Sequence, residues 1–174
     1  KTNIVTAGAG ENWHALVAWC VDNKLYGLEN LALIPGLLGG APIQNIGAYG
    51  VELKDVFYSL TAIEKTTGAL EMFTRDECEF AYRDSIFKHS AKDRFVITAV
   101  DFALPVKWQP VLGYGDVAQR VAQLGAVSPM NILKAVCAIR SEKLPDPAVL
   151  GNSGSFFKNP VVGAAQAEAL IQKF

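Results

Sequence analysis

The sequence predicts a mixed α+β fold, with one domain and the start of a second. Segments that read as strands lie among segments with the residue spacing of helices. Residues 144–147 read LPDP, and the two prolines of this stretch exclude a continuing helix. We therefore expect a first domain over residues 1–143 and the start of another over residues 144–174, within the usual size range of domains.

Composition limits the classes of function. Of the 174 residues, 51% are hydrophobic and 19% are charged, which is typical of a globular protein with a sizeable core. The net charge of -1 gives no electrostatic reason to expect nucleic acid or an anionic membrane as a partner. No run approaches the roughly 18 apolar residues of a membrane helix. The three cysteines form no CxxC pattern, so we expect no metal site, no disulfide framework and a cytoplasmic location.

The N-terminal part predicts a strand and then a helix. Residues 3–7 favour a strand, and residues 13–23 place Trp13, Leu16, Val17 and Cys20 on one helical face. Asn12 is a candidate N-cap. The preceding Gly-x-Gly is weak support for a dinucleotide fold, because a third glycine and the acidic residue are missing and Trp13 is too large for close helix packing.

Further elements are expected along the rest of the chain. A hairpin is expected with its turn at KTTG, a capping box of Thr74 and Glu77 predicts one short helical turn, and Ser128 with Pro129 marks a helix start. On that helix we expect Ile132, Val136 and Ile139 to share one face. The two strands of the hairpin are expected over residues 56–64 and 69–73, and a further strand over residues 95–105. A helical pattern is expected over residues 164–174.

Residues 34–50, IPGLLGGAPIQNIGAYG, are rich in glycine and contain no charged residue. Glycine loses the most backbone freedom on folding, so such a stretch costs stability unless the backbone must approach something closely. A surface loop is normally more polar. We therefore interpret these residues, here called the glycine wall, as a nearly apolar surface against a large flat partner, with backbone N–H groups free to face it.

Three other motifs are open to more than one interpretation. AYRDSIFKH (81–89) is either a salt-bridged surface turn or an arginine, Arg83, held by apolar packing so that it meets a carboxylate with two bonds. GYGDV (113–117) is a turn, or a loop that closes the Tyr114 phenol over a ligand. GNSGSFFKNP (151–160) is a capped turn or part of a site. It is not the nucleophile elbow of a serine hydrolase, since the spacing of its glycines and serines differs.

Taken together, the motifs resemble those of the UDP-N-acetylenolpyruvoylglucosamine reductase family of bacterial cell-wall precursor synthesis. Five of them occur in the family's order: IPGLLGGAPIQNIGAYG, YRDSIFKH, WQPVLGYGD, KLPDP and GNSGSFFKNP. The resemblance covers nearly the whole chain and implies the FAD-binding fold of the vanillyl-alcohol oxidase (PCMH) type, followed by the start of a substrate-binding domain.

The resemblance also implies the roles of individual residues. NADPH would reduce FAD, and hydride would then pass to the enolpyruvyl ether of UDP-N-acetylglucosamine enolpyruvate. Arg83 matches the residue that stabilises the negative charge on the substrate carboxylate, and Ser155 matches the proton donor. Tyr114, Lys143 and Asn159 match residues that hold the substrate. The positions that match cofactor contacts are Pro35, Gly36, Gly39, Gly40, Gln44, Asn45, Gly47 and Ala48.

Two parts of the family pattern have no counterpart in these residues. The phosphate-binding turn is expected ahead of Lys1, and the catalytic glutamate beyond Phe174. We therefore expect a fragment, inactive by itself, of a monomeric enzyme. A flavin-dependent oxidase on the same fold and a non-catalytic flavin-binding module are alternatives, although the first would need neither Ser155 nor Lys143.

Overall fold

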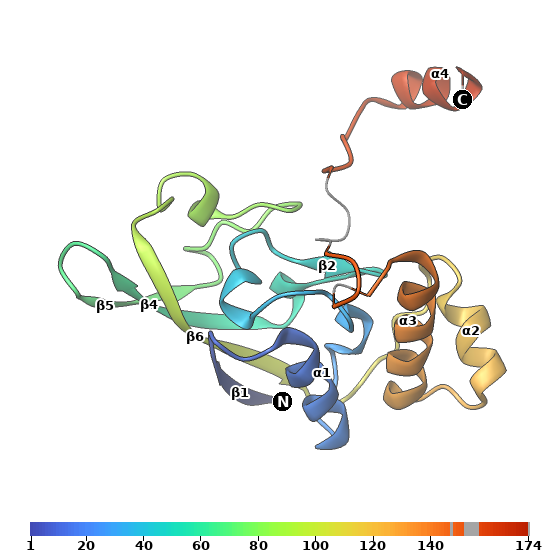
Figure 1. Ribbon diagram of the computed structural model, residues 1–174, viewed down its shortest axis with the longest axis horizontal. Helices are drawn as coiled ribbons and strands as arrows, with labels where there is room; N and C mark the ends of the chain where they lie inside the picture. Colours follow the sequence, from blue (N-terminus) through green and yellow to red (C-terminus); the bar gives the residue numbers. More distant parts are fainter. Residues whose placement is uncertain (147, 152–156, 174) are drawn as a thin grey trace.

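The computed structural model describes residues 1–146, 148–151 and 157–173. Its centre is a four-stranded antiparallel sheet with the strand order β1-β6-β4-β5 (Figure 1). The strands are β1 (Thr2–Gly8), β4 (Phe57–Glu64), β5 (Leu70–Thr74) and β6 (Phe95–Pro105). All four predicted strands are confirmed.

The sheet is held by a core on the inner face of its two central strands. Val100, Phe102 and Leu104 alternate along β6 and are fully buried, as the period of two predicts. Leu60 of β4 pairs with Val100 in the antiparallel ladder. Burying one side chain of this size contributes about 1.5–3 kcal/mol, so the central strands anchor the fold.

Helix α1 (Trp13–Asp22) packs on the core through the face that the sequence predicts. The Asn12 side chain accepts a hydrogen bond from the Ala15 N–H at 2.9 Å, which confirms the predicted N-cap. Trp13 is 1% exposed, lies against Phe102 with 6.2 Å between ring centroids, and donates its indole N–H to the Leu31 carbonyl at 2.8 Å. This large side chain therefore fills the space between helix and sheet.

Two further helices lie beside each other at one end of the sheet, at the right of Figure 1. Helix α3 (Pro129–Lys143) begins at Ser128, whose hydroxyl caps the Asn131 N–H, and buries the predicted face of Ile132, Val136 and Ile139. Helix α2 (Val117–Leu124) was not predicted from the sequence, because Asp116 makes no side-chain cap and the helix is short. Among the described residues no single helix is long and apolar enough to cross a membrane. The bent pair α2 and α3, at 119°, meets that test together on length and composition alone.

Short elements carry the glycine wall and its surroundings. The hydrogen bonds of the Thr74–Glu77 capping box form, but residues 75–79 make a turn and not the expected helical turn. Leu144, directly after α3, is extended, and residues 148–149 form a turn. The predicted C-terminal helix, α4 (Ala164–Lys173), buries no residue and projects away from the sheet (Figure 1). The short elements are η1 (Glu29–Leu31), η2 (Leu38–Gly40), η3 (Leu53–Asp55), η4 (Ile86–Lys88), β2 (Gly47–Ala48) and β3 (Val51–Glu52).

Candidate functional site

The glycine wall has an exposed surface, but several of its N–H groups are not free. The segment 35–37 is exposed, as are Gly40, Ile43 and Gln44. The N–H groups of residues 38–41, however, donate to the carbonyls of Glu11, Ala9, Leu37 and Leu38. The expectation of free N–H groups is therefore wrong for these four residues, because the 3₁₀ turn and the contact with the start of α1 already use them.

The glycines of the wall have two different reasons to be glycine. A Cβ at Gly36 or Gly40 would meet nothing within 4 Å, so both leave open surface, and Gly36 also needs its φ of +116°. A Cβ at Gly39 would lie 2.8 Å from that of Ala9. One at Gly47 would lie 2.6 Å from Nη1 of Arg83. Two glycines thus permit internal packing, and two lie at open surface where a flat ligand has room.

One side of the wall lines a cavity of about 780 Å³. Gly39, Gly40 and Ile43 form part of it, and the charged side chains that line it are Lys65, Lys88, Lys92 and Asp93, three cations against one carboxylate. The cavity therefore combines glycine and apolar surface with positive charge, a combination that suits a flat ligand with phosphate groups.

The other side of the wall lines a second cavity, of about 450 Å³, here called the basic pocket. It brings together residues that are far apart in the sequence. Seven predicted site residues line it: Gln44, Gly47, Ala48, Arg83, Tyr114, Lys143 and Asn159. Because Ile43 lines the first cavity and Gln44 the second, and Lys88 lines both, the two cavities adjoin along the wall.

The basic pocket concentrates positive charge in a chain whose net charge is -1. Its cations come from the turn before η4, from η4 itself, from α3 and from the segment after the gap at 152–156. They are Arg83, Lys88, Arg140, Lys143 and Lys158, and no aspartate or glutamate is among the described residues that line it. Such a lining favours a ligand with several negative charges.

Arg83 is held by polar partners, with φ at +54°. Its Nη1 lies 3.4 Å from Oε1 of Glu52, and Nη2 donates to the Gly47 carbonyl. Its guanidinium lies 5.0 Å from the centre of the Tyr82 ring. The expected apolar packing is therefore only partly correct: an ion pair to a distant segment and the glycine wall itself also orient the side chain. Its three hydrogen bonds, to the Asn45 and Gly47 carbonyls and to Glu52, use only part of its five-donor capacity and leave the rest for a ligand.

Asn45 differs from the other predicted cofactor residues because its side chain is fully buried. Its amide nitrogen donates to Glu52 Oε2 at 3.2 Å and to the Ala81 carbonyl at 2.9 Å, and its oxygen accepts from the Lys54 N–H at 3.0 Å. Asn45 was matched to a cofactor contact by resemblance, and in the fold its side-chain amide makes these three internal bonds. Asn45 instead joins the wall to the segment that carries Arg83.

The remaining predicted residues lie as follows. Tyr114 is 59% exposed, and its ring meets that of Tyr49 edge to face at 6.1 Å. Nζ of Lys143 lies 3.6 Å from Oδ2 of Asp116. Ser155 lies outside the described residues. Gly36 does not line the basic pocket, and Pro35 lines a third cavity.

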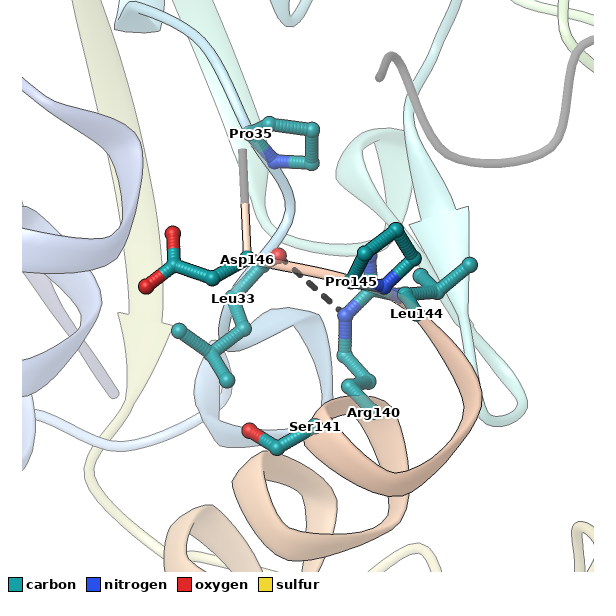
Figure 2. Close-up of a pocket in the computed structure, with 7 residues that line it drawn as sticks. All are labelled: Leu33, Pro35, Arg140, Ser141, Leu144, Pro145 and Asp146. Carbon is teal, nitrogen blue, oxygen red and sulfur yellow. Dashed lines mark hydrogen bonds between the residues drawn. The ribbon is translucent and has the colours of Figure 1, made fainter. Parts of the chain in front are cut away.

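That third cavity, of about 360 Å³, lies between the start of the wall and the end of α3 (Figure 2). Pro35 faces it from one side and Leu144 and Pro145 from another, and Nε of Arg140 donates to the Leu33 carbonyl at 3.2 Å. Arg140 also lines the basic pocket, and burial lowers the pKa of its guanidinium. Arg140 therefore lies between the third cavity and the basic pocket, with one N–H group bonded to the residue that directly precedes the wall.

Sequence reasoning missed several residues that shape the basic pocket. Arg140 was missed, although it lies three residues before the predicted Lys143 near the end of α3, a spacing that places both residues on one helical face. Glu52 and Lys158 had no comparable signal, because their partners are distant in sequence.

Among the described residues no group of histidine, cysteine and acidic side chains could hold a metal ion. Burial raises the pKa of Cys20 to about 11 and that of Cys78 to about 12.

Comparisons with known proteins show which proteins this chain is similar to. Residues 1–72 match the model of a family described as "FAD binding domain". The UDP-N-acetylenolpyruvoylglucosamine reductases of Burkholderia orbicola (strain MC0-3) and Ralstonia nicotianae are 57% and 55% identical over 170 and 172 residues, which are 95% and 98% of this chain but 49% and 50% of those relatives. The crystal structure of the Thermus caldophilus UDP-N-acetylenolpyruvylglucosamine reductase superposes with a TM-score of 0.64 at 25% identity, covering 90% of this chain and 48% of that one.

The fold and the family match define a FAD-binding domain. Over nearly its whole length the chain is similar to UDP-N-acetylenolpyruvoylglucosamine reductases, and the resemblance that the five motifs indicated is confirmed. It spans about half the length of the curated relatives that it matches.

Proposed function

We propose that this chain contributes the flavin site and part of the substrate site of an NADPH-dependent reductase. The substrate is UDP-N-acetylglucosamine enolpyruvate, and the product is UDP-N-acetylmuramate, a peptidoglycan precursor. The observation that carries this proposal is the basic pocket, where one side of the glycine wall meets five cations. This charge suits a substrate with a diphosphate and a carboxylate.

The glycine wall supports the proposal as a place for FAD. The open surface at Gly36 and Gly40 and the lysines of the adjoining cavity fit a flat dinucleotide with a pyrophosphate. FAD bound along the wall would supply the hydride chemistry between NADPH and the substrate. Pro35, Gly36, Gly39, Gly40, Gln44, Gly47 and Ala48 would lie along it, and Asn45 would keep the wall in place through the three side-chain bonds described above.

Arg83 is proposed to stabilise charge in the reaction. Hydride arrives at the terminal carbon of an α,β-unsaturated carboxylate, so negative charge builds up toward the carboxylate as the enolate forms. A cation that is already oriented before the reaction stabilises this charge without reorganisation. The ion pair with Glu52 and the bond to the Gly47 carbonyl supply that orientation.

The other predicted residues are proposed to hold the substrate and complete the reaction. Lys143 suits the diphosphate as a point charge, and Tyr114 and Asn159 line the same pocket. Ser155 is proposed to protonate the carbon next to the carboxylate. We also propose that residues 1–143 form the FAD-binding domain and that residues 144–174 begin the substrate-binding domain, since α3 ends at Lys143.

One absorbance experiment tests this function with the protein at the full length of its relatives. NADPH should bleach the flavin, and the enolpyruvyl sugar nucleotide should restore its absorbance and support continuous NADPH oxidation. Reoxidation by oxygen with a phenol or sugar alcohol as reductant would indicate an oxidase instead. Flavin binding without bleaching by NADPH would indicate a non-catalytic module.

A further inference from the structure

The loop that leads to Tyr114 is attached at its base to a buried side chain that the mechanism does not use. Asn30, in η1, is 2% exposed. Its amide nitrogen donates to the Tyr49 carbonyl and to the Val111 carbonyl, each at 2.9 Å. A side-chain amide has two N–H groups, so both donors of Asn30 are used. They join the segment at Tyr49 to the segment at Val111, which are far apart in the sequence.

Glu29, the neighbour of Asn30, holds the same loop at a second point. It is also 2% exposed, and its carboxylate accepts the Trp108 indole N–H at 2.5 Å and the Gly27 N–H at 2.7 Å. Buried polar groups are costly unless they are hydrogen-bonded. Two adjacent buried polar residues whose bonds reach the same loop therefore form a specific anchor.

The turn at Tyr49 and Gly50 fits closely against this anchored loop. Gly50 has φ at +81°, and a Cβ there would lie 3.2 Å from Cγ1 of Val111 and 3.7 Å from Cβ of Tyr114. The Tyr49 and Tyr114 rings are perpendicular, at 90°. Both tyrosines line the basic pocket, so the anchor at Asn30 sets the relation between two of its walls.

We infer that Glu29 and Asn30 are positioning residues: they hold the base of the Tyr114 loop, residues 108–111, against the Tyr49 turn and so present both tyrosines to the basic pocket. The anchor therefore fixes the base of the loop that carries Tyr114. The anchor then determines the affinity for the sugar nucleotide and does not affect the reduction of the flavin by NADPH. This consequence rests on the function proposed above.

Limited digestion of the 174-residue chain by chymotrypsin tests the anchor without any assay of activity. Cleavage after Tyr114 reports opening of the loop, and cleavage after Tyr58, equally exposed at 57% but in the central strand β4, reports opening of the sheet. Asn30→Ala removes both donors, so cleavage after Tyr114 should accelerate about tenfold or more, while cleavage after Tyr58 changes less than about twofold. Ser128→Ala, which removes a helix cap far along the chain, is the matched control and should not accelerate cleavage after Tyr114 selectively.

Glu29→Gln provides a second variant of nearly the same shape in case Asn30→Ala unfolds. It should also accelerate cleavage after Tyr114 in preference to Tyr58, because a glutamine has one acceptor oxygen for the two N–H groups at this point. Equal acceleration at both sites in the two variants, or none after Tyr114, would overturn the inference.

Steady-state and stopped-flow kinetics of the full-length protein give the functional measurement. In Asn30→Ala we expect KM for the enolpyruvyl sugar nucleotide to rise about tenfold, as for the loss of one oriented contact. Flavin bleaching by NADPH should stay within about twofold of wild type. An unchanged KM would overturn the role in the pocket. Wild-type protein that fails to oxidise NADPH would instead refute the proposed function, and the digestion result would still decide the anchor.

Discussion

At the scale of single residues, the basic pocket depends on side chains whose orientation comes from distant parts of the chain. Arg83 was found as a candidate from YRDSIFKH, but the ion pair with Glu52 is visible only in the fold. Asn45 was expected at the ligand, yet its three hydrogen bonds are internal. Residue type therefore indicated the chemistry, and packing decided which side chains face the cavity.

Arg83→Lys tests whether the planar guanidinium matters beyond its charge. Lysine keeps the positive charge but cannot make two parallel bonds to a carboxylate. We expect turnover of the full-length protein with the enolpyruvyl substrate to fall by roughly 10²-fold or more, as for loss of one preorganised donor. Flavin content should be measured alongside, because Arg83 also bonds to Gly47 of the wall. Turnover within about threefold of wild type, at normal flavin content, would contradict the role of Arg83.

Ser155→Ala separates the two half-reactions. NADPH reduces the flavin before any proton reaches the substrate, so bleaching should proceed at nearly the normal rate. Reoxidation by the substrate should slow by about 10² to 10⁴-fold, the usual contribution of a positioned acid. Stopped-flow traces in which both steps slow equally, or neither does, would remove Ser155 from the mechanism.

At the scale of elements, the start of α1 stabilises both a helix and the glycine wall. The Asn12 side chain caps α1, and the neighbouring backbone bonds to the wall, with the Trp13 N–H donating to the Gly36 carbonyl and the Leu38 N–H to that of Glu11. Asn12→Ala should lower the free energy of unfolding by about 1 kcal/mol, measured by urea titration. Asn12→Asp keeps an acceptor and is the matched control. Equal losses in both variants would show that the cap is not responsible.

The turn that carries Arg83 should lose a stabilising interaction in acid. Nε2 of His89 lies 2.9 Å from both carboxylate oxygens of Asp84, and this hydrogen bond is the main reason why the pKa of Asp84 is below its ordinary value of 3.8. Because the folded-state pKa is lowered, the stabilisation is fully present above that ordinary value and is lost as the pH falls through the folded-state pKa.

Asp84→Asn should therefore be less stable than wild type near neutral pH, and the difference should shrink in strong acid. Urea midpoints of both proteins at about pH 7 and about pH 3 measure this change. A difference of the same size at the two pH values would mean that the carboxylate charge is not involved.

At the scale of the whole molecule, the two cavities along the wall offer cations and open surface but few free backbone donors. The N–H groups of residues 38–41 are already bonded, so phosphate groups would rely there on Lys65, Lys88 and Lys92. We expect a protein as long as the curated relatives to purify with FAD, and we expect the 174-residue chain to retain much less FAD. The ratio of flavin to protein absorbance measures this, and equal ratios would contradict it.

The sequence alone determined the features that depend on neighbours along the chain. The N-caps Asn12 and Ser128, the buried helical faces and the KTTG hairpin follow from local hydrogen bonds and periodicity, and the structure confirms them. Helix α2 was not predicted from the sequence, because it has no side-chain cap to mark its start.

Only the tertiary structure decided how the site is assembled. A chain with a net charge of -1 gathers Arg83, Lys88, Arg140, Lys143 and Lys158 around one cavity, although no local pattern brings the 83–88 segment, the end of α3 and Lys158 together. The side chains of Asn45 and Asn30 are buried and hydrogen-bonded within the protein, because a buried amide needs hydrogen-bond partners and the fold supplies them from distant segments. Those partners are 36, 19 and 81 residues away, a separation at which spacing in the sequence carries no information about contact.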